Sequence, residues 1–201
     1  MIAIIDYDAG NLKSVKKALE FLGEEAVITR DEAILRKAEK LILPGVGNFG
    51  DCMDKLNSYN LTSIIRELVK AGKPILGICL GLQLFFEESE EAPNVKGLSL
   101  LEGKIVRIPK KEDITIPQIG WNSLNFKKDS RLFNGIDEGS FVYFVHSYYL
   151  QPKDMSIVSA TTQYSKELSI AVECDNIYAT QFHPEKSGDI GLKILKNFAT
   201  L

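Results

Sequence analysis

This chain of 201 residues has few cysteines and histidines, and it has no large excess of either sign of charge. The 24 lysines and arginines nearly balance the 27 aspartates and glutamates, so the net charge is −3. The sequence therefore lacks the basic excess typical of nucleic-acid-binding proteins, and we expect no nucleic-acid partner. The three cysteines, Cys52, Cys79 and Cys174, are too far apart for a disulfide framework. No cysteines or histidines have the spacing of a zinc site, so we expect no metal.

Long apolar runs are also missing. The longest stretches without a charged residue are 13 to 14 residues long, at 74–86, 114–126 and 139–152. A membrane-spanning helix needs about 20 apolar residues, so we expect no membrane segment. The first six residues turn acidic without a basic flank and predict a buried strand instead of a signal peptide, which makes the protein cytoplasmic by default. No linker or repeat divides the chain, which predicts one domain over residues 1–201.

Hydrophobic periodicity predicts an α/β fold in the first half. Leu12, Val15, Leu19 and Leu22 recur at three or four residues, the spacing of a helical face. Unbroken apolar runs are typical of strands buried on both faces of a parallel sheet. The expected strands cover 2–6, 26–29, 40–43 and 74–78, and the expected helices cover 12–22, 61–71 and 80–88.

The second half is richer in strands of antiparallel type. Asp175-Asn176 separates two extended runs and predicts a hairpin turn. Together the halves predict a three-layer α/β fold with a mostly parallel central sheet and an antiparallel C-terminal part. Strands are expected at 103–109, 116–126, 141–149, 156–164, 168–174 and 177–182, and a final helix at 190–198.

Cys79 is the most informative residue, because it lies where an apolar strand meets a helix, within Gly77-Ile78-Cys79-Leu80-Gly81. This is the nucleophile elbow with cysteine in place of serine, a tight turn that requires very small residues two positions away. The helix dipole favours the thiolate, and the Leu80 amide is placed to donate to an oxyanion. The alternative is a free cysteine that only packs in the core.

A thiol nucleophile needs a base, and His183 is the better placed of the two histidines. It follows an apolar strand, and Pro184 biases it towards an extended conformation. Residues i and i+2 of an extended segment point to the same side, so Glu185 is expected to orient the His183 ring. We predict a triad of Cys79, His183 and Glu185; the alternative is a surface histidine at a strand end.

The segment Pro44-Gly45-Val46-Gly47 is expected to bring backbone N–H groups close to a substrate, with Val46 and Gly47 beside the oxyanion. Residues 45–50 also match G-x-G-x-x-G, a pattern of dinucleotide-binding loops. Such folds place an acidic residue after the next strand, about 20 residues on. Here that residue is Glu67, inside an amphipathic helix. We interpret the match as accidental and expect no cofactor.

These motifs carry a resemblance. The elbow, the His-Pro-Glu segment and the Pro-Gly-Val-Gly loop resemble class-I, triad-type glutamine amidotransferases. The segments 6–12, 95–98, 120–122 and 145–148 are similar to the glutaminase subunits of imidazole glycerol phosphate synthase, from histidine biosynthesis. The resemblance implies that L-glutamine is hydrolysed through a thioester on Cys79. It also implies that ammonia passes to a (βα)₈-barrel cyclase subunit in a heterodimer, which forms imidazole glycerol phosphate and aminoimidazole carboxamide ribotide.

The resemblance also assigns substrate contacts. Glutamine is a zwitterion, so its site needs an acid for the ammonium group and donors for the carboxylate. Ordinary polar roles in a helix or loop are the alternative for these residues. The residues that the resemblance places at the amino-acid end of glutamine are Gln83, Glu91, Ser147 and Tyr148.

Partner contacts follow from the same resemblance. Trp121 is the only tryptophan, and tryptophan is enriched at the centres of protein interfaces. A partly buried core aromatic is the alternative. The residues expected to face the partner are Asn11, Trp121, Tyr143 and Lys186.

Two other functions remain open at this point. One is an amidotransferase subunit for anthranilate or p-aminobenzoate synthesis, although such subunits typically carry Gly-His-Gln after the cysteine where this chain has Gly81-Leu82-Gln83. The other is a non-catalytic nucleotide-binding module that uses residues 45–50.

Overall fold

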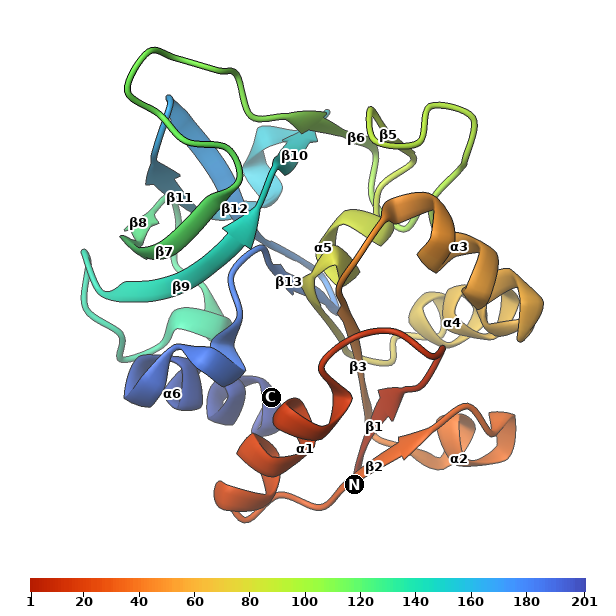
Figure 1. Ribbon diagram of the computed structural model, residues 1–201. Coiled ribbons are helices and arrows are strands. Elements are labelled where there is room, and N and C mark those ends of the chain that lie inside the picture. The colour runs from red at the N-terminus through yellow and green to blue at the C-terminus, as the bar shows by residue number, and fades with distance from the viewer.

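A computed structural model describes all 201 residues (Figure 1). The first half alternates strands and helices, as its periodicity predicts. Its strands pair in parallel in the order β2-β1-β3-β4. These strands are β1 (Ile2–Ile5), β2 (Ala26–Thr29), β3 (Lys40–Gly45) and β4 (Ile75–Cys79), and the helices are α1 (Leu12–Phe21), α2 (Glu32–Lys37), α3 (Phe49–Ser58), α4 (Leu61–Lys70) and α5 (Leu80–Leu84).

The second half extends this sheet beyond β4. The added strands are β5 (Glu88–Ser89), β6 (Gly103–Arg107), β8 (Asn125–Phe126), β10 (Tyr148–Pro152), β11 (Val158–Gln163), β12 (Glu167–Cys174) and β13 (Ile177–Thr180). The sheet continues from β4 as β13-β12-β10-β6-β5, while β11 pairs with β12 and β8. Strand β13 is parallel to β4, and the β12–β13 pair forms the hairpin predicted at Asp175-Asn176.

Two further strands, β7 (Gln118–Ser123) and β9 (Phe141–His146), form a separate antiparallel ribbon. The chain ends in α6 (Gly188–Ala199). None of the helices is long and apolar enough to cross a membrane.

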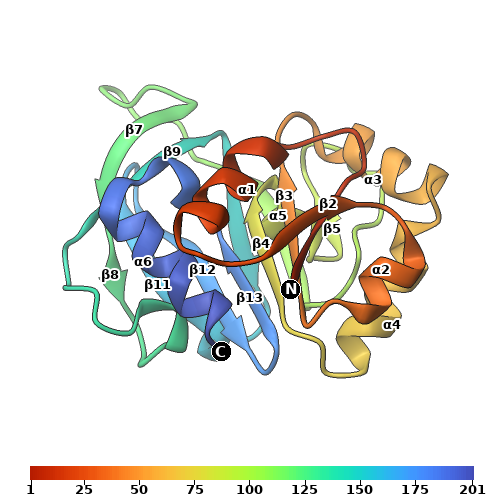
Figure 2. The same ribbon diagram turned by 90° about the horizontal axis from the view of Figure 1, so that it is seen from below.

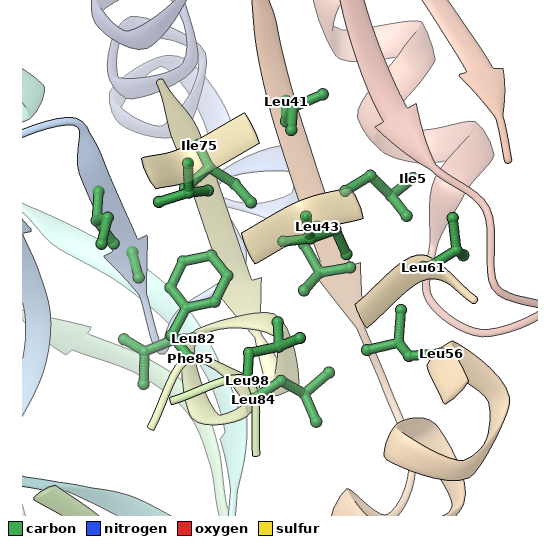
Figure 3. Packing of buried hydrophobic residues seen from close by; sticks show 14 of the residues in the cluster. Ile5, Leu41, Leu43, Leu56, Leu61, Ile75, Leu82, Leu84, Phe85 and Leu98 are labelled. Carbon is green, nitrogen blue, oxygen red and sulfur yellow. The ribbon is translucent and has the colours of Figure 1, made fainter. Parts of the chain in front are cut away.

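The first strands carry unbroken apolar runs because each faces a core on both sides of the sheet. In β1, Ala3 and Ile5 belong to one buried cluster, while Ile2 and Ile4 belong to the other. Helices α2 to α5 cover the first cluster, part of which is drawn in Figure 3, and α1 and α6 cover the second (Figure 2). The predicted three-layer α/β fold with a mixed sheet is therefore confirmed.

Several boundaries differ from the prediction. The helix expected over 80–88 ends at Leu84, because the carbonyl oxygens of Leu84 and Phe85 accept from the amides of Leu98 and Leu100 instead of from the next helical turn. The strand expected over 141–149 divides at Ser147 into β9 and β10, which belong to different sheets. The Ser147 carbonyl accepts from the Ile108 amide at 2.9 Å and so fixes this bend.

Helices α2 and α3 were absent from the prediction. Each has a polar cap that stabilises its first turn. The side chain of Asp31 accepts from the Ile34 amide at 3.1 Å, and that of Asn48 accepts from the Gly50 amide at 2.8 Å. The caps were visible in the sequence. Helix α2 has six residues, which leave little periodicity to find, but α3 has ten, as α1 does, and its apolar spacing was overlooked.

Candidate active site

Cys79 is the last residue of β4 and lies directly before α5, with φ at +56°. This region is unfavourable for a residue with a side chain and is found where surrounding packing enforces it, often at active sites. A Cβ atom on Gly81 would lie 1.8 Å from the carbonyl oxygen of Leu43, and one on Gly77 would lie 2.9 Å from the Gly81 oxygen. Only glycine fits at either position, as the elbow pattern predicts.

Strand β13 brings the second part of the site beside the elbow. Thr180 of β13 pairs in register with Ile78 of β4, so the chain that follows β13 passes Cys79. There, the Nδ1 atom of His183 lies 2.9 Å from Oε1 of Glu185. The contact agrees with the prediction, but its basis differs: Glu185 lies in a 3₁₀ turn, Pro184–Lys186, and not in an extended segment.

Burial disfavours the charged form of His183, but the neighbouring side chains favour it more strongly. Burial by itself lowers the pKa of the ring, whereas hydrogen bonds to Cys79 and Glu185 and the charges of both raise it, to about 10. The Oε2 atom of Glu185 is buried and has no hydrogen-bond donor, so the carboxylate acts on the histidine alone. The surroundings therefore favour a protonated His183 ring, which Glu185 holds next to Cys79.

A cleft of about 320 Å³ opens over Cys79. All residues predicted for catalysis, the oxyanion and the substrate line it, apart from Glu185, which lies buried behind His183. His146 and Pro117, which were given no such role, also line it, as does Lys186, which was expected to face a partner. The predicted lining residues are Val46, Gly47, Cys79, Leu80, Gln83, Glu91, Ser147, Tyr148 and His183.

The glycine loop that follows β3 forms one wall of this cleft. Gly47 has φ at +101°, which favours glycine, and the Val46 carbonyl accepts from the Cys52 thiol at 3.6 Å. In a trans peptide the N–H points opposite to the carbonyl, so the Gly47 N–H is directed away from Cys52.

The start of α3 is occupied by the chain's own side chains. The Oε2 atom of Glu91 accepts from the Phe49 amide at 2.8 Å, and Oδ1 of Asn48 accepts from the Gly50 and Asp51 amides at 2.8 and 3.3 Å. The amides that would bind a phosphate are therefore already paired, which disfavours a nucleotide site at residues 45–50.

Sequence reasoning missed a buried polar network beneath the cleft. The Tyr148 carbonyl accepts from Nδ1 of His146 at 2.8 Å and from Nε2 of Gln83 at 3.4 Å. Burial lowers the pKa of His146 to about 4, so the ring is neutral. Gln83 also donates to Gln181 at 3.0 Å. Gln181 was detectable, because it precedes His183 by two residues and so points to the same side of an extended segment.

None of the four predicted partner-facing residues is buried. Trp121 and Tyr143 pair across the β7–β9 ribbon in an edge-on arrangement, with ring centroids 6.0 Å apart. Trp121 is 55% exposed, so the core-aromatic alternative is wrong. Ile119 and Phe141, which the prediction omitted, share this outer face and are also exposed. Figure 2 shows the ribbon and the start of α1, which Asn11 precedes, along the same edge of the molecule.

Solved structures of other proteins share the fold of this chain. A crystal structure of a glutamine amidotransferase superposes with a TM-score of 0.78 at 21% identity over all of both chains. The structure of PurLQS from Thermotoga maritima gives 0.74 at 21% identity, covering 99% of this chain and 97% of that one. At these identities the likeness shows the fold alone.

Sequence relatives are much closer. The imidazole glycerol phosphate synthase subunit HisH of Syntrophotalea carbinolica is 48% identical over all of both chains. That of Aquifex aeolicus is 50% identical over 97% of this chain and 94% of its own. The family model for glutamine amidotransferase class-I matches residues 3–200. The chain therefore belongs to the class-I glutamine amidotransferases and, among them, to the family of HisH subunits of imidazole glycerol phosphate synthase.

Proposed function

We propose that this chain is the glutaminase subunit of an imidazole glycerol phosphate synthase, which hydrolyses L-glutamine to glutamate and ammonia at Cys79. The observation that carries the proposal is the buried His183–Glu185 pair beside an elbow cysteine, at the base of a cleft, in a chain of the HisH family. The relatives named HisH favour this function over anthranilate or p-aminobenzoate synthesis.

In the first half of the proposed reaction, the Cys79 thiolate attacks the side-chain carbonyl carbon of glutamine. The carbonyl oxygen becomes an oxyanion, to which the Leu80 N–H donates, aided by an N–H of the loop at Val46 or Gly47. The His183 imidazolium then gives its proton to the leaving nitrogen, the carbon–nitrogen bond breaks, and ammonia departs from a thioester.

The second half returns the enzyme to its starting state. Neutral His183 removes a proton from water, and the resulting hydroxide attacks the thioester carbon. The carbon–sulfur bond breaks, glutamate is released, and the thiolate is restored beside a protonated ring. Glu185 keeps the ring in one orientation and stabilises its charge in both halves.

The amino-acid end of glutamine would lie in the part of the cleft lined by Gln83, Glu91, Ser147 and Tyr148. Glu91 uses one carboxylate oxygen for the Phe49 amide, which leaves the other for the substrate ammonium group. Both N–H groups of Gln83 are paired within the protein, so its Oε1 is the atom that faces the cleft. Ser147 and Tyr148 complete this end of the site.

The proposed partner is a (βα)₈-barrel cyclase in a cytoplasmic heterodimer. The exposed apolar face of the β7–β9 ribbon, with Trp121 and Tyr143 on it, supports a docking surface there. Tyr143 connects this surface to the catalytic segment, because its carbonyl accepts from the His183 amide at 3.0 Å. Lys186, the other residue expected to face the partner, lines the cleft itself.

Ammonia release from glutamine tests the proposal. The purified chain is assayed alone, with the cyclase subunit, and with the cyclase and its ligand, and labelling by a diazo-ketone analogue of glutamine is mapped by peptide mass spectrometry. We expect hydrolysis in the liganded complex and label on Cys79. Hydrolysis that survives complete labelling of Cys79, or no hydrolysis in any complex, would reject the assignment.

A further inference from the structure

Gln181 is wholly buried immediately after β13, beside the elbow. Its backbone is fixed, since its amide donates to the Ile170 carbonyl at 2.7 Å. Its side chain has two partners and both belong to the site: Oε1 accepts from Gln83, and Nε2 lies 3.7 Å from the sulfur of Cys79. A fully buried amide between a nucleophile and a substrate-binding side chain requires an explanation beyond packing.

The partners of these amides fix which end faces which. The Tyr148 carbonyl can only accept, so Gln83 must turn its nitrogen towards it. The second N–H of that nitrogen points at Gln181, which must therefore present its oxygen. The nitrogen of Gln181 is then left facing the sulfur of Cys79. The Tyr148 carbonyl thus determines the orientation of the Gln83 amide, which in turn determines that of the Gln181 amide.

We infer that Gln181 is a positioning residue for the proposed glutaminase site, which stabilises the Cys79 thiolate with one N–H and holds Gln83 with its oxygen. A hydrogen bond to a charged acceptor is stronger than one between neutral groups, so Gln181 favours the thiolate over the thiol. By pairing with Gln83, it also leaves the Gln83 oxygen as the acceptor in the cleft. The role of Gln181 in holding Gln83 rests on the proposed function, whereas its role in stabilising the Cys79 thiolate does not.

Other groups near the Cys79 sulfur also influence its reactivity. His183 forms a side-chain hydrogen bond with Cys79, and Tyr7 interacts with it electrostatically. The sulfur also lies 3.8 Å from the carbonyl oxygen of Val145. The other titratable groups that line the cleft are Glu91, His146, Tyr148 and Lys186. All of these groups remain in the chain when Gln181 is replaced, so comparison with a control variant isolates the effect of the lost N–H on thiol reactivity.

The first measurement is the pH profile of alkylation of Cys79 by iodoacetamide in the full-length chain, followed on the Cys79 peptide because Cys52 and Cys174 are also free. Gln181→Met keeps the volume and removes both hydrogen bonds. We expect its alkylation midpoint to rise by about half to one pH unit, a three- to tenfold loss of rate below the midpoint. The matched control is Thr180→Val, which removes the neighbouring buried hydroxyl and leaves the midpoint unchanged.

The second measurement separates the two roles by a double-mutant cycle in the complex with the cyclase. Gln181→Met should raise KM for glutamine about three- to tenfold, but it should change KM less than twofold when Gln83→Met is already present. Gln83→Met alone should move the alkylation midpoint less than Gln181→Met does, because it releases the Gln181 amide without removing its N–H groups. Thermal unfolding of each variant checks that the fold is intact. A loss of fold would not produce this combination of a shifted alkylation midpoint and coupled KM values.

An alkylation midpoint for Gln181→Met equal to that of wild type and of Thr180→Val overturns the inference. If the methionine variant does not fold, Gln181→Asn, which withdraws the amide by one methylene, decides the same comparison. A wild-type complex that releases no ammonia rejects the proposed function instead, and the alkylation midpoints still decide the role of Gln181 at the sulfur.

Discussion

His183 and Glu185 meet at 2.9 Å across a turn of the chain, so the base and the group that orients it come from one short segment. Both side chains are almost completely buried. The carboxylate therefore acts on the ring without competition from solvent, and together with Cys79 it raises the pKa of His183 against the opposing effect of burial.

Glu185→Gln should lower kcat for glutamine hydrolysis by about 10²–10³-fold while KM changes little. An amide can turn an N–H towards the ring and favour the wrong tautomer, which costs about 10⁴-fold in a serine triad. A cysteine ionises more readily and depends less on the carboxylate. Steady-state kinetics of the cyclase complex check this, and an unchanged kcat would show that the site works as a dyad.

Cys79→Ala should abolish glutamine hydrolysis without unfolding the protein. The thiolate is the attacking group, whereas the small alanine side chain fits the same turn, so we expect a change of less than about 1 kcal/mol in the free energy of unfolding. The complex should still form product when ammonium is supplied directly. Residual glutamine turnover in purified Cys79→Ala would reject the assignment of the nucleophile.

Val46→Gly should raise basal hydrolysis in the free subunit and narrow the difference from the activated complex. A peptide of this loop that turns its N–H to the oxyanion adds a donor, and one such donor is worth about 10²–10³ in rate. The Val46 side chain is 43% exposed, so its removal leaves no cavity in the core. The measurement is ammonia release with and without the liganded cyclase; two unchanged rates would place the switch elsewhere.

Ile119→Glu should weaken binding of the cyclase about 10- to 100-fold, because it places a charge within the apolar face of the β7–β9 ribbon. Ile119 is 64% exposed, so the fold should tolerate the change. Met155→Glu is the matched control, since Met155 is 60% exposed but lies outside the ribbon. Titration calorimetry against the cyclase compares them, and equal affinities would remove the ribbon from the interface.

His146→Asn should make stability less sensitive to acid. Burial lowers the pKa of His146 to about 4 from its usual 6.5, so the unfolded chain binds this proton first as the pH falls. The stabilising contribution is complete above pH 6.5 and lost as the pH falls through 4, about 3.4 kcal/mol in all. Asparagine can still donate to the Tyr148 carbonyl. Urea unfolding at pH 7 and pH 4.5 should show a smaller loss for the variant; an equal loss contradicts the prediction.

Residues whose geometry is set locally were predictable. Gly77 and Gly81 indicate the elbow, because no larger residue fits at either position. Pro184 and Glu185 likewise indicate that His183 is the base. The division of 141–149 was not predictable, because it depends on Ser147 receiving the Ile108 amide from a distant segment. The position of Gln181 two residues before His183 was visible in the sequence, but its partners were not: Gln83 and Cys79 become its neighbours only when β13 pairs beside β4.

The place of β13 also has a consequence for synthesis on the ribosome. The sheet is assembled from both halves, yet β13, the strand that joins them through β4 and β12, is among the last to be made. Cys79 and Gln181 are separated by 102 residues, so the nascent chain carries its nucleophile long before it carries the base. Bringing such distant segments together is a slow step in folding. A ribosome-bound fragment that ends before β13 should therefore be catalytically inert, and a truncated product could not release ammonia into the cell.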